Sequence, residues 1–170
     1  MLGGEKMDYF EIKNVKDTLN KSLFLSKPLT NYDAKQLNLS NTYFEDEEEN
    51  FLPKQWFCSM PIAQWEGVEI FVQGDSEKPY AKFIDLAERI FDQLHQHVSS
   101  ALKYLKNFFP AQEVDDFYLT TISFGKILNF DDHILSGFSL AFYSEYPNEF
   151  QYKVKFKEDG WPIGFEGGPF

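Results

Sequence analysis

The stretch of residues 79–108 constrains the fold more than any other part of the chain. Its apolar residues recur at steps of one, three or four positions, from Phe83 through Leu94 to Phe108, which places them in one stripe along an α-helix. Acidic residues lie near the start of this stretch, lysines lie near its end, and Pro110 follows, as the helix dipole and proline geometry favour. The pattern predicts one amphipathic helix about 45 Å long.

Segments rich in aromatic and β-branched residues lie on both sides of this helix and predict strands. The expected strands are residues 55–60 and 68–73 before the helix, then 116–125, 137–146 and 150–157 after it. The last strand alternates apolar and polar residues, which is typical of antiparallel strands with one solvated face. The glycine-rich end, residues 161–170, is too irregular to predict a strand throughout.

The order of these elements predicts an α+β fold. We expect an antiparallel sheet of about five to seven strands, with the helix over 79–108 packed across one face. Residues 55–165 would form this β-β-α-β-β-β core within a single domain over 1–170. Residues 1–50 show no clear periodicity.

Charge limits the classes of partner. The chain holds 16 Lys and Arg against 27 Asp and Glu, a formal charge of −11, which repels nucleic acids and anionic membranes and favours a basic protein partner. Solubility alone is the alternative interpretation of this charge. The candidate contact residues are an acidic run and three tryptophans: Glu45, Asp46, Glu47, Glu48, Glu49, Trp56, Trp65 and Trp161. A core rich in aromatic rings is the alternative for the tryptophans.

Cysteine content and hydropathy predict a cytoplasmic protein. Cys58 is the only cysteine, so no disulfide forms within the chain, and its aromatic surroundings in the sequence favour a buried structural role. The chain begins without the basic and apolar regions of a signal peptide, and no segment approaches the roughly 20 apolar residues of a membrane helix. Nucleotide-binding and nucleophile motifs are absent, so no cofactor is predicted. The oligomeric state does not follow from the sequence.

Two histidine-containing stretches are candidates for catalysis. His95 and His97 lie two residues apart, so on a helix their rings point about 200° apart and do not share a metal ion. Asp131, Asp132 and His133 form the second candidate, a carboxylate–imidazole cluster suited to a metal-assisted hydrolase. If the chain runs out and back, these residues would lie near an acidic pair at the start of the preceding strand, Asp115 and Asp116. We favour a non-catalytic function, because no specific spacing supports the cluster.

Three lysines, Lys153, Lys155 and Lys157, occupy the polar face of the strand at 150–157. The interpretation that we favour is a solvated strand or an edge strand, where lysines block unwanted pairing with other chains. An anion-binding patch is the alternative.

The segments VEIFVQGD, DFYLTTISF and FQYKVKFKEDGWPIGF, with the intervening helix and the Asp159-Gly160 turn, give residues 55–165 a resemblance to a class of bacterial domains. In element order, this region resembles small uncharacterised bacterial α+β domains, some of which are acidic immunity proteins that accompany toxins. The resemblance implies a stoichiometric inhibitor of a basic toxin enzyme. It assigns no functional residues.

Overall fold

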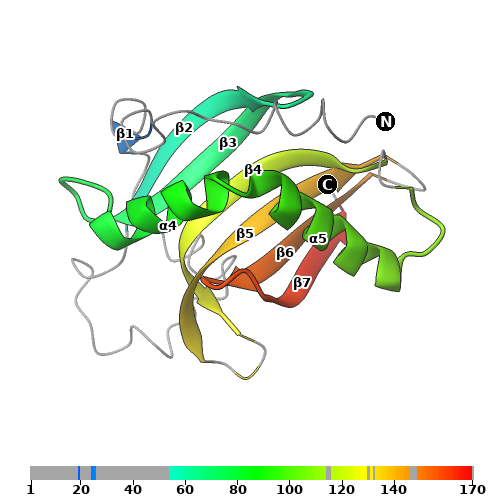
Figure 1. The fold of residues 1–170 in the computed structure, drawn as a ribbon. Helices are drawn as coiled ribbons and strands as arrows, with labels where there is room; N and C mark the ends of the chain where they lie inside the picture. The colour runs from blue at the N-terminus through cyan, green and yellow to red at the C-terminus, as the bar shows by residue number, and fades with distance from the viewer. Residues whose placement is uncertain are drawn as a thin grey trace.

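A twisted sheet with two helices across one face forms the described part of the protein, as a computed structural model shows (Figure 1). The structure describes residues 19, 24–25, 54–113, 116–129, 131, 133–145 and 149–169. Its strands run in the spatial order β1-β2-β3-β4-β5-β6-β7. The elements are β1 (Phe24–Leu25), β2 (Lys54–Ile62), β3 (Trp65–Gly74), α4 (Ala81–Phe91), α5 (Leu94–Phe108), β4 (Tyr118–Leu128), β5 (Ile134–Ser144), β6 (Phe150–Lys157) and β7 (Pro162–Pro169).

The sheet is mixed, so the prediction of an antiparallel sheet is wrong. β3 and β4 pair in parallel, with Ile70 opposite Ile122, whereas the other neighbouring strands pair antiparallel. The helices carry the chain from the end of β3 back to the level at which β3 began. A connection of this kind makes two adjacent strands parallel, because a tight hairpin is not available to reverse the direction.

The predicted single helix over 79–108 is also wrong, because the structure contains two shorter helices. α4 ends at Phe91, and α5 begins at Leu94 after a break at Asp92 and Gln93, where the Gln93 backbone has φ −130° and ψ 32°. The apolar stripe continues through the break, with Phe91 and Leu94 both buried. The surface of a sheet with the usual right-handed twist turns away from a straight helix about 45 Å long. A break that changes the direction of the helix keeps its apolar side chains in contact with the sheet.

The core lies between the helices and the inner face of the sheet. Phe138 and Phe156 stack there with ring centroids 4.7 Å apart and planes 3° apart, and both side chains are fully buried. Burying a phenylalanine side chain contributes about 1.5–3 kcal/mol. The predicted alternation in β6 is confirmed, because Tyr152, Val154 and Phe156 are buried. Since β7 pairs along β6, the glycine-rich end of the chain is a strand, which the sequence pattern did not predict.

Part of the N-terminal region packs onto this core. Leu19 is buried within the same cluster of apolar side chains, and Phe24 pairs opposite Phe57 at the start of the sheet. Neither helix in the described part of the chain is long and apolar enough to cross a membrane.

We expect Gly137→Ala to destabilise the protein by about 1–3 kcal/mol, because the added methyl group would overpack the centre of the sheet. A Cβ at Gly137 would lie 2.1 Å from the backbone oxygen of Phe156, an atom that moves only if β6 moves. Denaturant unfolding measures the effect. Gly67→Ala is the matched control, because no atom lies within 4 Å of its added Cβ, and equal stabilities of the two variants would contradict the expectation.

Candidate functional site

An acidic hollow lies where the break between the helices meets the turn between β6 and β7. Its volume is about 480 Å³, and the residues that line it are Arg89, Ile90, Asp92, Gln93, His97, Glu158 and Asp159. The side chains of Asp92, Glu158 and Asp159 are exposed. Three acidic residues and one arginine therefore line this hollow, which gives it a negative potential.

The turn that forms one wall of the hollow is held by its own backbone. Gly160 has φ +89°, and its N–H donates to the carbonyl of Lys157 at 2.9 Å. The Trp161 N–H donates to Oδ1 of Asp159 at 3.0 Å. A side chain at Gly160 would be strained and would place its Cβ 2.8 Å from Cε1 of His97, so glycine allows the turn to approach α5 closely.

Arg89, at the end of α4, links the helix to this turn by a hydrogen bond. Its Nη2 donates to the backbone carbonyl of Glu158 at 2.9 Å, so the guanidinium is directed at a neutral group rather than at a carboxylate. Trp161 follows immediately after the turn and is 69% exposed, the largest exposed fraction among the large hydrophobic side chains of the described residues. Acidic residues thus line the hollow, and an exposed indole follows its wall in the sequence. This pair of features suits a lysine or arginine side chain, which binds carboxylates and stacks on aromatic rings.

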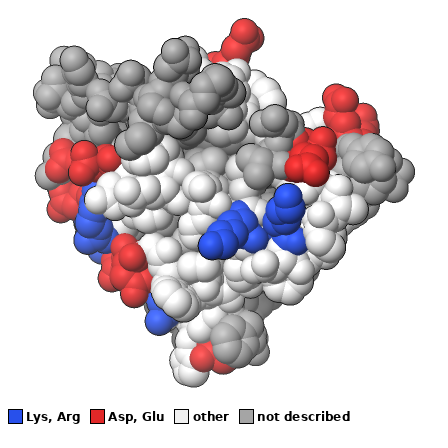
Figure 2. Space-filling model, turned by 45° about the vertical axis from the view of Figure 1, so that its right-hand side comes forward, with Lys and Arg blue, Asp and Glu red and all other residues white. Residues whose placement is uncertain are grey.

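The two signs of charge are unevenly distributed on the surface. On the face seen in the space-filling view, Asp and Glu side chains lie around the margin, with Lys or Arg beside them on the left, and other Lys or Arg side chains lie within a largely uncharged central area (Figure 2). A partner with clustered positive charge would therefore bind some orientations better than others.

The imidazole ring of His97 packs against the aromatic core. Its ring lies edge-on to Phe138 with centroids 5.2 Å apart, and burial followed by the charge of His95 lowers its pKa. Among the residues that the structure describes, no group of three or more His, Cys, Asp or Glu side chains is placed to hold a metal ion.

The lowered pKa of His97 predicts a loss of stability in acid. The unfolded chain protonates this histidine near its ordinary pKa of 6.5, whereas the folded protein resists protonation until a lower pH. The free energy of unfolding is therefore unaffected by this histidine above about pH 6.5 and decreases as the pH falls below that value. Urea unfolding at about pH 7.5 and pH 5 should show a larger loss for the wild type than for His97→Gln. Equal losses would contradict this assignment, since carboxylate titration is common to both proteins.

The structure separates the residues that the sequence analysis singled out for binding. Glu45, Asp46, Glu47, Glu48 and Glu49 lie outside the described residues. Trp65 is buried in the core at 4% exposure, and Trp56 is partly buried, with its Nε1 donating to the Asp75 carbonyl at 2.9 Å. Trp161 alone among the three tryptophans offers a large exposed surface. It follows the turn that forms one wall of the acidic hollow, although it does not line the hollow itself.

The proposed catalytic cluster lies at the tip of the hairpin between β4 and β5. Asp131 Oδ2 and His133 Nδ1 are 2.9 Å apart, and both side chains are substantially exposed. Hydrogen bonds from the His133 side chain and backbone lower the pKa of Asp131. Asp132 lies outside the described residues.

Asp116 does not join this cluster. Its carboxylate accepts the Glu113 N–H at 2.7 Å just before β4, whereas Asp131 follows the other end of that strand. At about 3.3 Å per residue, the length of β4 separates them by more than 30 Å. Asp115 is outside the described residues. The expected approach of the two acidic pairs is therefore wrong for Asp116 and Asp131.

Cys58 is buried in β2 at 3% exposure, and burial raises the pKa of its thiol from 9.0 to about 11. Its position agrees with the predicted structural role, since no thiolate is available for nucleophilic attack near neutral pH.

We expect the Cys58 thiol to react about 100-fold more slowly with Ellman's reagent at pH 8 in the folded protein than in urea. A pKa near 11 leaves about one-hundredth of the thiolate that a pKa near 9 allows, and burial slows reagent access further. Absorbance of the released thiolate measures the rate. Similar rates in both conditions would contradict the burial of Cys58.

The sequence pattern did not predict the acidic hollow, because the residues that line it come from segments far apart in the chain. Asp92 belongs to the helix break, and Glu158 belongs to the turn after β6. The Asp159-Gly160-Trp161 sequence was the only local signal, since it indicates a turn beside a large aromatic residue.

No protein-family model, curated protein or solved structure matches the chain. The function is therefore argued from the geometry and charge of the described residues.

Proposed function

We propose that this protein is a non-catalytic domain that binds a basic protein through the acidic hollow. The observation that carries the proposal is the acidic lining of the hollow, together with Trp161, a 69% exposed indole that follows the turn residues Asp159 and Gly160 in the sequence. Exposed Trp side chains are frequent at the energetic centres of interfaces, where each contributes about 2–4 kcal/mol on truncation. The carboxylates would select a lysine or arginine of the partner.

The charge of the whole chain supports the same partner class. A formal charge of −11 attracts a basic protein over several ångströms and raises the rate of encounter. The hollow would then supply the short-range contacts that hold the complex together. Glu45–Glu49 would add to the attraction, and their contribution remains a prediction.

The most specific form of this proposal is an immunity-type inhibitor of a basic toxin. Such an inhibitor acts by occupying a surface of the enzyme, so it needs charge complementarity and an aromatic anchor rather than catalytic groups. The resemblance in element order supports this form. The proposal retains a cytoplasmic location, where an unpaired cysteine such as Cys58 stays reduced.

A metal-assisted hydrolase at Asp131 and His133 is the alternative that we favour less. Both residues are exposed at a hairpin tip, where they bond to each other and the His133 carbonyl accepts the Asn129 N–H at 2.8 Å. Asp and His in this arrangement stabilise a turn.

A pull-down from the native host with quantitative mass spectrometry tests the proposal. We expect the wild-type protein to capture a basic protein, and we expect Trp161→Ala and the double variant Asp92→Asn/Glu158→Gln each to reduce its recovery at least tenfold. Glu77→Gln/Glu113→Gln is the matched control, because it removes two exposed negative charges away from the hollow and should retain binding.

Two results would overturn the proposed function. One is the recovery of no basic protein, and the other is equal capture by the hollow variants and the control variant. If the hollow double variant and the control double variant reduce binding equally, the partner is attracted by the net charge of the protein and not by the hollow.

A further inference from the structure

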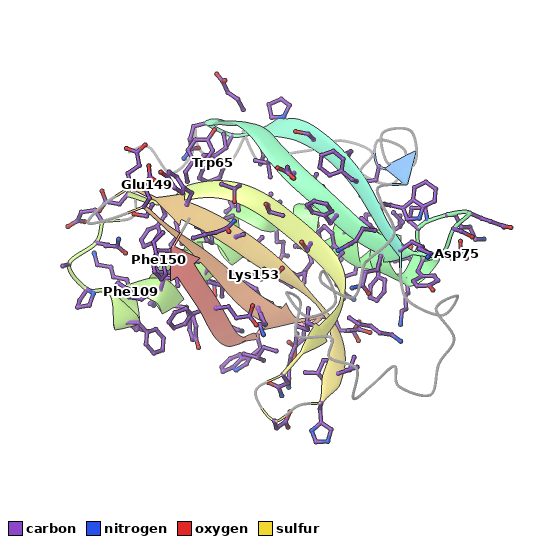
Figure 3. The ribbon with its side chains drawn as sticks, turned by 180° about the vertical axis from the view of Figure 1, so that it is seen from behind. Trp65, Asp75, Phe109, Glu149, Phe150 and Lys153 are labelled. Carbon is purple, nitrogen blue, oxygen red and sulfur yellow. The ribbon has the colours of Figure 1, made fainter. Side chains whose placement is uncertain are left out.

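The face of the sheet opposite the helices carries an unusual group of basic side chains. Lys153 and Lys155 project from β6 on this face, and Lys153 lies near its middle (Figure 3). β6 is paired on both sides, with β5 and with β7. The interpretation of β6 as an edge strand is therefore wrong. Lys157 is exposed, as a solvated strand would have it, whereas Lys153 and Lys155 are partly buried, so their presence inside the sheet needs another reason.

Small residues surround the two lysines and create a depression. Lys155 lies opposite Ser139, which lies opposite Ser123, and Lys153 lies opposite Ala141. Because these neighbours are short, the longer lysine side chains border a cavity of about 40 Å³. A space of this size holds a few water molecules, and it is far below the roughly 300–1,000 Å³ of a pocket for a drug-sized molecule.

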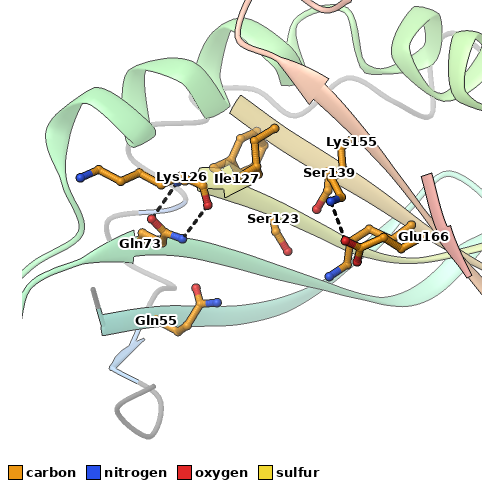
Figure 4. Close-up of a pocket in the computed structure, with 11 residues that line it drawn as sticks. Gln55, Gln73, Ser123, Lys126, Ile127, Ser139, Lys155 and Glu166 are labelled. Atoms are coloured by element: carbon orange, nitrogen blue, oxygen red, sulfur yellow. Dashed lines mark hydrogen bonds and ion pairs between the residues drawn. The ribbon is translucent and has the colours of Figure 1, made fainter. Parts of the chain in front are cut away.

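Polar groups line the cavity from several strands. Gln55 comes from β2, Ser123 from β4, Ser139 from β5 and Glu166 from β7 (Figure 4). The Gln73 side chain closes one end: its Oε1 accepts the Lys126 N–H at 2.8 Å, and its Nε2 donates to the Lys126 carbonyl at 3.3 Å. The Gln73 side chain thereby continues the hydrogen bonding between β3 and β4 beyond their last backbone pair, Val72 and Phe124. The cavity wall is held rigidly by strands, which favours a preformed site.

The two ammonium groups differ in their surroundings. Nζ of Lys155 is 2.5 Å from Oε1 of Glu166, whereas Lys153 forms no ion pair with any residue that the structure describes. Burial lowers the pKa of Lys153, the nearby Glu166 carboxylate opposes this change, and Lys155 adds to it. Glu166 lies opposite Lys153 in the register, yet the pKa of Lys153 stays lowered, so the folded protein would gain free energy when a further anion approaches this ammonium group.

We propose that this cavity binds one oxyanion group, a carboxylate or a phosphate of a small ligand, with Lys153 as the principal cation. Lys155 would support the same anion from its pair with Glu166, and the hydroxyl groups of Ser123 and Ser139 are within the cavity to donate hydrogen bonds. The size of the cavity admits the acidic group and leaves the rest of the ligand outside. This site is separate from the acidic hollow and does not depend on the proposed function.

The matched control lies on the same strand. Lys157 is exposed and does not line the cavity, so Lys157→Met removes the same charge as Lys153→Met without touching the site. Methionine also retains most of the aliphatic chain of lysine. The Lys153→Met variant would therefore still cover the small neighbouring residues, but it would lose the positive charge that attracts an anion.

Side-chain NMR of the lysine Hε and Cε groups tests the proposal with inorganic phosphate and, separately, acetate as probes. We expect a saturable shift of the Lys153 signals with little change at Lys157. We expect the apparent affinity to fall at least tenfold in Lys153→Met and to stay within twofold of the wild type in Lys157→Met. Saturation by phosphate alone, by acetate alone or by both would assign the preferred oxyanion.

Sodium chloride at matched ionic strength provides the reference for non-specific screening. Equal shifts with chloride, parallel shifts of Lys153 and Lys157, or unchanged affinity in Lys153→Met would overturn the proposal. If Lys153→Met does not fold, the comparison of Lys153 with Lys157 in the wild-type protein still decides the outcome. Loss of the partner protein in the pull-down would leave these results unaffected, since the two sites are tested by different probes.

Discussion

The packing of α4 and α5 on one face of the sheet is the interaction on which the rest of the structure depends. The helices bury the apolar face, where Phe138 and Phe156 stack, and Lys153 and Lys155 lie on the other face. They also return the chain so that β4 can pair in parallel with β3. Burial of this face supplies most of the stabilising free energy, because the hydrophobic effect is the dominant favourable contribution to folding.

Two polar sites of opposite sign follow from this arrangement. The break between the helices brings Asp92 close to the turn that contains Asp159, which creates an acidic hollow beside Trp161. The face of the sheet opposite the helices holds Lys153 and Lys155 among serine and alanine residues, which creates a small basic cavity. An acidic chain can maintain such a cavity because the strands position both lysines and Glu166 neutralises only one of them at close range.

The predictable features were those that depend on local periodicity. The apolar stripe correctly placed its residues from Phe83 to Leu105 in the core, but its last member, Phe108, is 53% exposed. The alternation in 150–157 matched the bounds of β6 and its buried side chains. Parallel pairing was missed because side chains alternate in the same way in parallel and antiparallel strands. The helix break was missed because Asp92 and Gln93 are compatible with a continuous helix, and no proline or glycine marks the position.

By itself, the sequence determined the residue types that must be buried, the strong negative charge and the single unpaired cysteine. These properties depend on composition and on the periods of helices and strands, which act over neighbouring residues. Only the tertiary structure decided that β6 is an interior strand, that Trp65 is in the core while Trp161 is exposed, and that Asp92 meets the turn at Asp159. Each of these outcomes depends on which distant segments become neighbours, and that choice follows from burying one continuous apolar surface.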